Sequence, residues 1–436
     1  MSRSKRRWQA VTLLSLVVGY AGYYVCRSNL SVATPLLLDA FGEEGLDKAW
    51  IGFISSVGVT FYAIGKLING TLTDFVGGRR IFLFGMVGSI AATIAFGLGT
   101  GVVVFLIAWS ANRLVQSMGW PGLVKVASQW FSHRSYGRVM GFLSLSFLFG
   151  DAAARLLLGE FIDYGFGWQA VFLFSAAILG VIALVNMVTL KSSPQELGFE
   201  TTVVNPNNLF GQDGDATRPK DVRDLLGPLL RSRSFWIVMF LSAGMTLIRQ
   251  SFTFWTPTFL VEVAGMSNSS AAQYSLLYPL VGGFSVLFVG HASDRWTAGR
   301  RGLVMTLVLV PLVPTLLVMS TLETTGALVP LLLVSASAFM LIGPYSFLSG
   351  AMALDLGGKK GSSTAAGFID GAGYAGAILS GWAVGWVAQH LGWNWVFIAL
   401  AIVAALTLVA AIVYWRYHEE ALPEAAATGA VNEGSG

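Results

Sequence analysis

Charged residues are scarce in this chain of 436 residues. They make up 11% of the sequence, whereas a soluble chain carries about 25%. Cysteine is almost absent, because Cys26 stands alone and cannot form an internal disulfide. The four histidines follow no metal-ligand pattern; they are His133, His291, His390 and His418. These deficits exclude a soluble globular enzyme and give no reason to expect a metal.

Motifs for nucleotide chemistry are missing too. The sequence contains no GxxxxGK[ST] loop, the motif of ATP-driven pumps. Its Gly-x-Gly runs lie inside apolar segments, where small residues allow helices to approach closely. The net charge of +4 gives little indication of nucleic-acid binding. We therefore expect no enzyme activity, no cofactor and no nucleic-acid partner.

Apolar sequence, in contrast, is abundant. Hydrophobic residues make up 55% of the chain, and continuous runs near the ~20 residues that cross a bilayer recur along its length. Twelve spans are predicted, at 10–36, 50–74, 81–99, 102–131, 137–160, 168–190, 235–262, 271–292, 303–321, 327–355, 362–389 and 394–416. The predicted fold class is an all-α membrane protein with twelve transmembrane helices in two six-helix halves.

Basic residues lie in alternate loops between these spans. They fill the N-terminal segment and recur at Arg79 and Arg80 and at Arg134 and Arg138, whereas the opposite loops carry mainly Asp and Glu. The positive-inside rule therefore predicts a multi-pass protein of the cell (inner) membrane with both termini in the cytoplasm.

One long polar stretch, residues 191–234, divides the spans into six and six. Its length and composition favour a cytoplasmic linker over a small folded domain. The predicted domains are an N-terminal six-helix bundle at 1–190 and a C-terminal six-helix bundle at 235–418. Residues 419–436 are predicted to form a disordered cytoplasmic tail.

The two halves repeat one another. Arg27 recurs as Arg249 at an offset of 222 residues, and each precedes a proline by eight residues. Two further pairs follow at offsets of 220 and 225: Gly70-x3-Asp74 with Gly290-x3-Asp294, and Gly167-Trp168 with Gly392-Trp393. Three pairs in one order at nearly one offset indicate a duplication, which places a shared site between the halves near the membrane midplane.

Arg27 and Arg249 are the leading candidates for substrate binding. A guanidinium keeps its charge in proteins, and an arginine inside a membrane span is by default a candidate functional residue. Two of them facing one cavity would bind an anion, and phosphate suits their bidentate geometry. The alternative is that each arginine is structural and pairs with a carboxylate or a helix carbonyl.

Lys66 is a candidate third cation. It lies eight residues before Asp74, about two helical turns into the membrane. The alternative is an ammonium group that reaches the cytoplasmic boundary. Tyr24, Tyr278 and Tyr374 are candidate cavity-lining residues, and the alternative for each is packing against a helix or lipid.

Five further charged residues are candidates for gating or coupling. Asp74 and Asp294 occupy repeated loop motifs in which the aspartate accepts hydrogen bonds from a neighbouring helix end while the adjacent arginines sit in water. Asp151 and Arg155 lie four residues apart, on one helix face. They are candidates for a structural ion pair, for a gate or, through the aspartate, for a proton-binding site. Asp370 could pair with a basic residue of another helix or bind a proton.

Four segments carry a family resemblance: YYVCRSNLSVATP, AIGKLINGTLTD, SMGWPGLVK and LIRQSFTFWTPTFL. They resemble the organophosphate:phosphate antiporters of the major facilitator superfamily, such as the glycerol-3-phosphate and hexose-6-phosphate transporters. The resemblance implies the superfamily's fold and matches Arg27 and Arg249 to the family's phosphate-binding arginines and Lys66 to a cavity lysine. It implies exchange of a phosphorylated metabolite for inorganic phosphate by alternating access. We expect the protein to be a monomer in the lipid bilayer.

Departures from the family pattern leave the organic part of the substrate open. Ser28 stands where the family often has lysine, Phe147 where glycerol-3-phosphate members have histidine, and Gly122 follows MGWP. A proton-coupled organic-anion symporter, with Asp151 or Asp370 titrating, is one alternative. A transporter-like sugar-phosphate receptor is another.

Overall fold

A computed structural model describes residues 3–43, 48–215, 218–266, 274–297, 299–323 and 326–420. Within these ranges the chain is helical and has no β-strand, which confirms the predicted all-α class. Glu419, the first residue of the predicted disordered tail, is instead helical and accepts hydrogen bonds from the backbone N–H groups of Gly302 and Leu303. The predicted tail beyond Glu420 lies outside the described residues.

The helices fall into two sequential groups. The first comprises α1 (Arg3–Phe41), α2 (Lys48–Val76), α3 (Gly78–Gly97), α4 (Val102–Gln116), α5 (Gly119–Trp130), α6 (Tyr136–Asp163) and α7 (Trp168–Thr189). The second comprises α9 (Arg233–Glu262), α11 (Leu277–Trp296), α12 (Arg301–Leu309), α13 (Leu312–Ser320), α14 (Leu328–Tyr345), α15 (Ala353–Leu391) and α16 (Trp393–Tyr414). The short helix α8 (Val222–Arg231) lies between the groups, and the π-helical segment η4 (Phe347–Met352) joins α14 to α15.

The predicted spans coincide with these helices. In the described chain, eight helical stretches are long and apolar enough to cross a membrane, and Leu328–Ala388 contains two predicted spans. Two predicted spans are each broken into two helices near prolines. Pro121 follows the break between α4 and α5, and Pro311 lies between α12 and α13, because proline cannot donate the backbone hydrogen bond that continues a helix.

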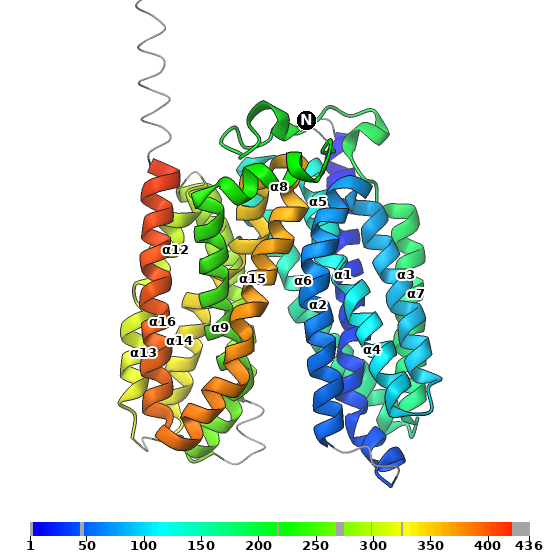
Figure 1. The fold of residues 1–436 in the computed structure, drawn as a ribbon, viewed down its shortest axis with the longest axis vertical. Helices are drawn as coiled ribbons and strands as arrows, with labels where there is room; N and C mark the ends of the chain where they lie inside the picture. Colours follow the sequence, from blue (N-terminus) through cyan, green and yellow to red (C-terminus); the bar gives the residue numbers. More distant parts are fainter. Residues whose placement is uncertain are drawn as a thin grey trace, which may run out of the picture.

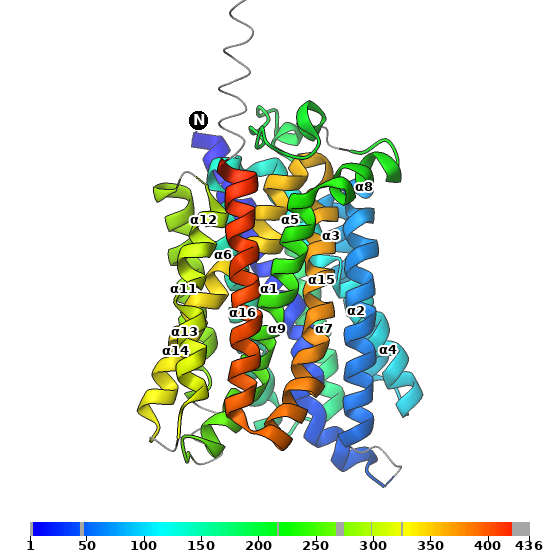
Figure 2. The same cartoon turned by 60° about the vertical axis from the view of Figure 1, so that its left-hand side comes forward.

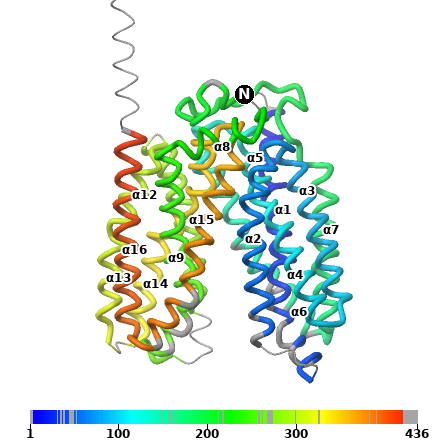
Figure 3. Tube along the Cα trace, in the orientation of Figure 1, coloured from blue at the N-terminus to red at the C-terminus, as the bar shows by residue number. Residues whose placement is uncertain are grey.

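The two groups lie side by side, and they are closest at one end of the helices. Figure 1 shows α1–α7 on the right and α9–α16 on the left, joined at the top, where α8 and the N-terminus lie, and diverging toward the bottom. The view in Figure 2 places α8 at the same end, and the Cα trace in Figure 3 diverges in the same way. We call the end that carries α8 the linker face.

Glycine permits the closest approach between the halves at the linker face. Gly70 of α2 faces Gly367 of α15, and a Cβ atom at Gly70 would lie 2.9 Å from the carbonyl oxygen of Ser363. A Cβ atom at Gly367 would collide with the carbonyl oxygen of Lys66. The backbones of α2 and α15 therefore meet with no room for a side chain at either glycine.

Substitution of Gly367 by valine should force the halves apart at the linker face. We expect it to raise the maleimide reactivity of a Cys at buried position Ser362 by about tenfold, equivalent to ~1.4 kcal/mol in the open-to-closed balance. Gly180→Val is the matched control, because nothing lies within 4 Å of the Cβ position at Gly180. Equal reactivity in both variants would show that this glycine contact does not hold the face closed.

Candidate functional site

A cavity opens between the two halves, beyond their contact at the linker face. It is open on one side, and about 570 Å³ of space in and at its mouth is free of protein atoms. Its lining combines aromatic rings with a few polar and charged groups. From the first half it includes Tyr20, Tyr24, Tyr62, Lys66, Trp120, Ser144 and Phe147; from the second it includes Arg249, Val286, Ile342, Tyr345, Ser346, Ser349, Asp370 and Tyr374.

Arg27, on α1, is not part of this lining; it contacts two of the lining residues, Tyr24 and Tyr62, and is held by neutral partners. Its Nε donates to Gln116 at 3.0 Å and its Nη1 to the Tyr24 hydroxyl at 3.0 Å. The guanidinium carbon lies 4.4 Å from the ring centre of Tyr24 and 4.6 Å from that of Tyr62. Its Nη2 is buried and has no hydrogen-bond partner. The positive charge is therefore oriented without being neutralised.

Arg249, on α9 of the second half, likewise contacts an aromatic ring and keeps a buried N–H group without an acceptor. Its guanidinium carbon lies 4.6 Å from the ring centre of Tyr345, and its buried Nε has no hydrogen-bond partner. Across the residues that the structure describes, neither Arg249 nor Arg27 has a carboxylate within 4.0 Å. The structural alternative, in which each arginine is paired with its own acid, does not apply to this conformation.

Lys66 is paired with an acid of the other half. Its Nζ lies 2.7 Å from Asp370, on α15, and the two side chains are 1% and 12% exposed. Lys66 therefore does not reach the membrane boundary. This ion pair joins α2 to α15 at the cavity wall. Lys66 is therefore the basic residue of another helix that pairs with Asp370.

Tyrosines supply much of the remaining polar surface. Tyr24 and Tyr374 line the cavity, as their prediction requires. Tyr278 lies outside this lining; it is buried and stacks on Phe252, with ring centres 5.3 Å apart. Tyr62 was not predicted, yet its ring meets Tyr374 across the halves with centres 5.3 Å apart. Its position four residues before Lys66, on the same helix face, is the signal that could have identified it.

Asp74 forms the first of two polar contacts that close the linker face. It lies 2.7 Å from Lys125 of α5 and accepts hydrogen bonds from the backbone N–H and the hydroxyl of Thr364, both at 2.8 Å. Lys125 also donates to the backbone carbonyl groups of Lys359 and Lys360. Lys125 is buried because α15 of the other half covers it.

Asp294 forms the second contact. It accepts backbone hydrogen bonds from Gly137 and Arg138, at the start of α6, and lies 3.4 Å from Arg301. Arg301 also lies 2.6 Å from Asp355. The prediction that the arginines of these motifs sit in water is wrong for Arg301, which is 2% exposed, because the two acids enclose it.

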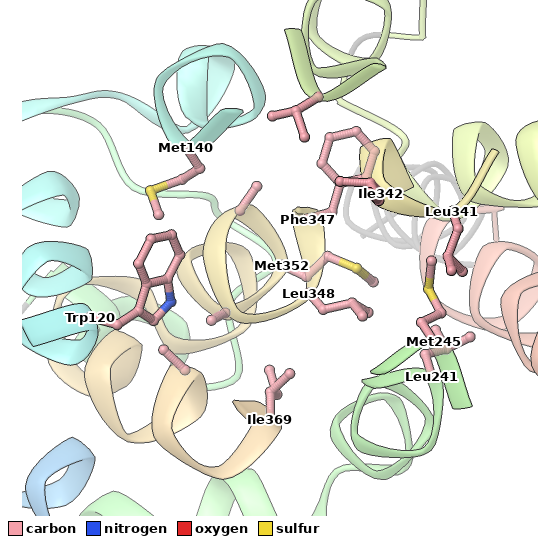
Figure 4. Packing of buried hydrophobic residues seen from close by; sticks show 14 of the residues in the cluster. Trp120, Met140, Leu241, Met245, Leu341, Ile342, Phe347, Leu348, Met352 and Ile369 are labelled. Atoms are coloured by element: carbon pink, nitrogen blue, oxygen red, sulfur yellow. The ribbon is translucent and has the colours of Figure 1, made fainter. Parts of the chain in front are cut away.

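Apolar side chains close the floor of the cavity below these contacts. Figure 4 shows Trp120 and Met140 of the first half facing Phe347, Leu348 and Met352 of the second. The indole N–H of Trp120 donates to the Ser349 carbonyl at 2.9 Å. The site is therefore sealed from the linker face by both polar and apolar contacts between the halves.

Asp151 lies beside the site, on α6. It accepts a 2.5 Å hydrogen bond from Ser28, the residue that follows Arg27. The side chain of its predicted partner, Arg155, lies outside the described residues. Asp151 therefore contacts Ser28, the residue that follows Arg27 in the chain, and is not part of the cavity lining.

The linker contacts both halves at the linker face. Thr202 donates to the carbonyl of Gln129 in the first half at 3.0 Å, and the Leu209 N–H donates to the Leu356 carbonyl in the second at 2.9 Å. Lys360 donates to Asp224 of the linker at 2.8 Å, and this hydrogen bond lowers the pKa of Asp224. These contacts add to the closure of this face.

Comparison with known proteins gives a consistent assignment. The sequence profile of the family described as Major Facilitator Superfamily matches residues 16–349. A probable hexose phosphate transport protein of Chlamydia trachomatis is 26% identical over 97% of this chain and 94% of its own length. The glycerol-3-phosphate transporter of Bacillus subtilis is 26% identical over 95% and 94%. Human sugar phosphate exchanger 3 is 26% identical over 83% and 78%. These relatives confirm the resemblance stated from the sequence motifs.

Solved structures share the fold at low identity. The E. coli fucose:proton symporter aligns with a TM-score of 0.70 at 15% identity, covering 93% of this chain and 99% of the symporter. A proton:xylose symporter aligns with a TM-score of 0.67 at 14% identity, covering 95% and 96%. The relatives and these structures are transporters and not enzymes.

The ion pair between Lys66 and Asp370 generates a prediction about stability. Asp370→Asn leaves the Lys66 charge buried and unpaired, at a cost of about 3 kcal/mol. We expect a lower melting midpoint in detergent for Asp370→Asn and recovery of most of the loss in the double variant Lys66→Met/Asp370→Leu. Glu160→Gln, which removes an exposed acid of α6, should leave the midpoint unchanged. A double variant that melts at or below the midpoint of Asp370→Asn would contradict the pairing.

Proposed function

This chain belongs to the Major Facilitator Superfamily and is a multi-pass membrane protein, and we propose that it exchanges a small phosphorylated organic anion for inorganic phosphate by alternating access. The proposed substrates are a sugar phosphate, a glycerol phosphate or a phosphonate. The relatives named for hexose phosphate, glycerol-3-phosphate and sugar phosphate support this substrate class.

One observation carries the proposal: each half brings one arginine without a paired acid to the cavity region, Arg249 in the lining and Arg27 against the lining residues Tyr24 and Tyr62. Arg27 and Arg249 both keep a buried N–H without an acceptor. A buried donor without a partner is costly, and a buried charge without a counterion is more so. A phosphate group between the halves supplies both the acceptors and the negative charge, and its oxygens suit the fork geometry of guanidinium.

The same geometry explains how phosphate could drive the conformational change. A ligand shifts a conformational equilibrium only through different affinities for the two states. An anion that contacts Arg27 and Arg249 together favours the state in which the two halves approach each other around the cavity. Without a bound anion, the positive charges of the two arginines repel each other. If the empty carrier therefore changes conformation slowly, the protein exchanges one anion for another.

The basic loops orient the molecule in this proposal. Arg79 and Arg80 lie at the start of α3, directly after the Asp74 contact. Arg138 donates to Asp294 in the second contact of the linker face. The positive-inside rule then makes the linker face cytoplasmic. Both ends of the described chain lie at this face, on the cytoplasmic side of the cell membrane. The conformation is then closed to the cytoplasm, and the cavity faces outward.

The proposed anion site is tested by replacing each arginine with lysine. Arg27→Lys or Arg249→Lys keeps the charge but loses the bidentate fork, which we expect to reduce phosphate exchange in proteoliposomes by a factor of about 10–100. Arg6→Lys, at an exposed position in the N-terminal segment, is the matched control and should exchange at the wild-type rate. Wild-type exchange by either cavity variant would remove the basis of the proposal.

The coupling mode is tested by counterflow. Vesicles loaded with unlabelled phosphate should accumulate labelled phosphate with no pH gradient, and a protonophore should leave the initial rate unchanged, because exchange moves no net proton. In this conformation Asp370 is occupied by its ion pair with Lys66 at 2.7 Å. Accumulation that requires an imposed proton gradient would support the symporter in place of the antiporter.

A further inference from the structure

Arg113 is a fourth cation at the cavity, and neither the repeat nor the ion pairs account for it. It lies near the end of α4 and is 9% exposed. In the described part of the chain no carboxylate lies within 4.0 Å of Arg113 and its side chain makes no hydrogen bond. A buried guanidinium without an acid or an acceptor is costly, so its presence calls for a partner that binds there.

Arg113 and Arg27 share one aromatic ring. The guanidinium carbon of Arg113 lies 4.8 Å from the ring centre of Tyr62, and that of Arg27 lies 4.6 Å from the same centre. Trp109 flanks Arg113 at 5.9 Å, and a Cβ atom at Gly58 would lie 3.0 Å from the Arg113 stem. Two helices therefore fix the side chain beside Tyr62, which itself lines the cavity.

The charges around the cavity do not balance. Arg27, Lys66, Arg113 and Arg249 contribute four positive charges, each on a side chain that lines the cavity or faces one of its tyrosine rings. Asp370 is the one acid in the described lining, and it offsets Lys66. Three positive charges remain, whereas a phosphate ester carries up to about two negative charges. One positive charge stays uncompensated when a simple phosphate ester binds.

We propose that Arg113 binds a carboxylate on the organic part of the substrate, so that the preferred substrate is a phosphorylated carboxylic acid. This inference rests on the proposed phosphate site between Arg27 and Arg249 and names the substrate class of that site. A carboxylate contributes the single negative charge that is missing, and it accepts bidentate hydrogen bonds from guanidinium. A second phosphate group would add up to about two negative charges, which is more than the one remaining positive charge requires.

Two small esters provide a matched test. 3-Phosphoglycerate and glycerol 3-phosphate have the same three-carbon frame and phosphate ester, and differ by a carboxylate in place of a hydroxymethyl group. Each is added as a competitor of labelled phosphate counterflow in proteoliposomes. We expect 3-phosphoglycerate to inhibit the wild-type protein at a concentration about tenfold lower, equivalent to ~1.4 kcal/mol.

Variants at Arg113 assign the preference to that side chain. Arg113→Gln should remove the difference between the two esters, so that 3-phosphoglycerate and glycerol 3-phosphate inhibit at concentrations within about twofold of each other. Arg113→Lys keeps a point charge and should retain part of the preference. Arg6→Gln, which removes an exposed arginine, should behave like the wild type.

The outcomes separate this inference from the function on which it rests. Phosphate counterflow with equal inhibition by the two esters overturns the role of Arg113 but keeps the antiporter. A preference that persists in full in Arg113→Gln also overturns it. If that variant does not fold, a preference that persists in full in Arg113→Lys overturns it instead. Absence of any phosphate counterflow overturns both proposals.

Discussion

Uncompensated positive charge in the cavity between the halves is the constraint on which the rest of the structure depends. The protein holds Arg27 and Arg249 with aromatic faces and neutral acceptors, which orient a guanidinium without cancelling it. Gln116 is important here, because it accepts from Arg27 while its own amide donates to the Cys26 carbonyl at 3.1 Å. An acid in its place would have occupied the site that an anionic substrate needs.

The closed linker face shows how buried charge is treated where no substrate enters. There, Asp74 with Lys125 and Asp294 with Arg301 are matched pairs, and each acid also accepts backbone hydrogen bonds from the opposite half. The two contacts are related by the internal duplication, so closure is distributed over both sides of the interface. Opening this face must break both contacts, and a transport cycle requires a compensating gain elsewhere, such as contacts that the substrate makes with both halves.

Several features of the site could be predicted because they depend on local sequence. The depth of Arg27, Lys66 and Arg249 follows from their positions in apolar runs, and the repeat identified the two arginines as related. The partner of Lys66 could not be predicted, since Asp370 lies in the other half of the chain and only the packing of α2 on α15 brings them together. Burial of Arg301 was missed for the same reason, because Asp355, which encloses it together with Asp294, lies on α15, far along the chain.

The amino-acid sequence by itself determined a helical membrane protein, its two related halves and the depth of its charged residues, because hydrophobic run length, loop charge and internal repetition are local properties of the chain. Only the tertiary structure decided which charges are neutralised and which are left for a ligand. Neutralisation depends on distances of a few ångströms between side chains of helices that are far apart in sequence. Coulomb attraction is strong only at such distances, so the packing of the helices determines whether a buried charge has a counterion.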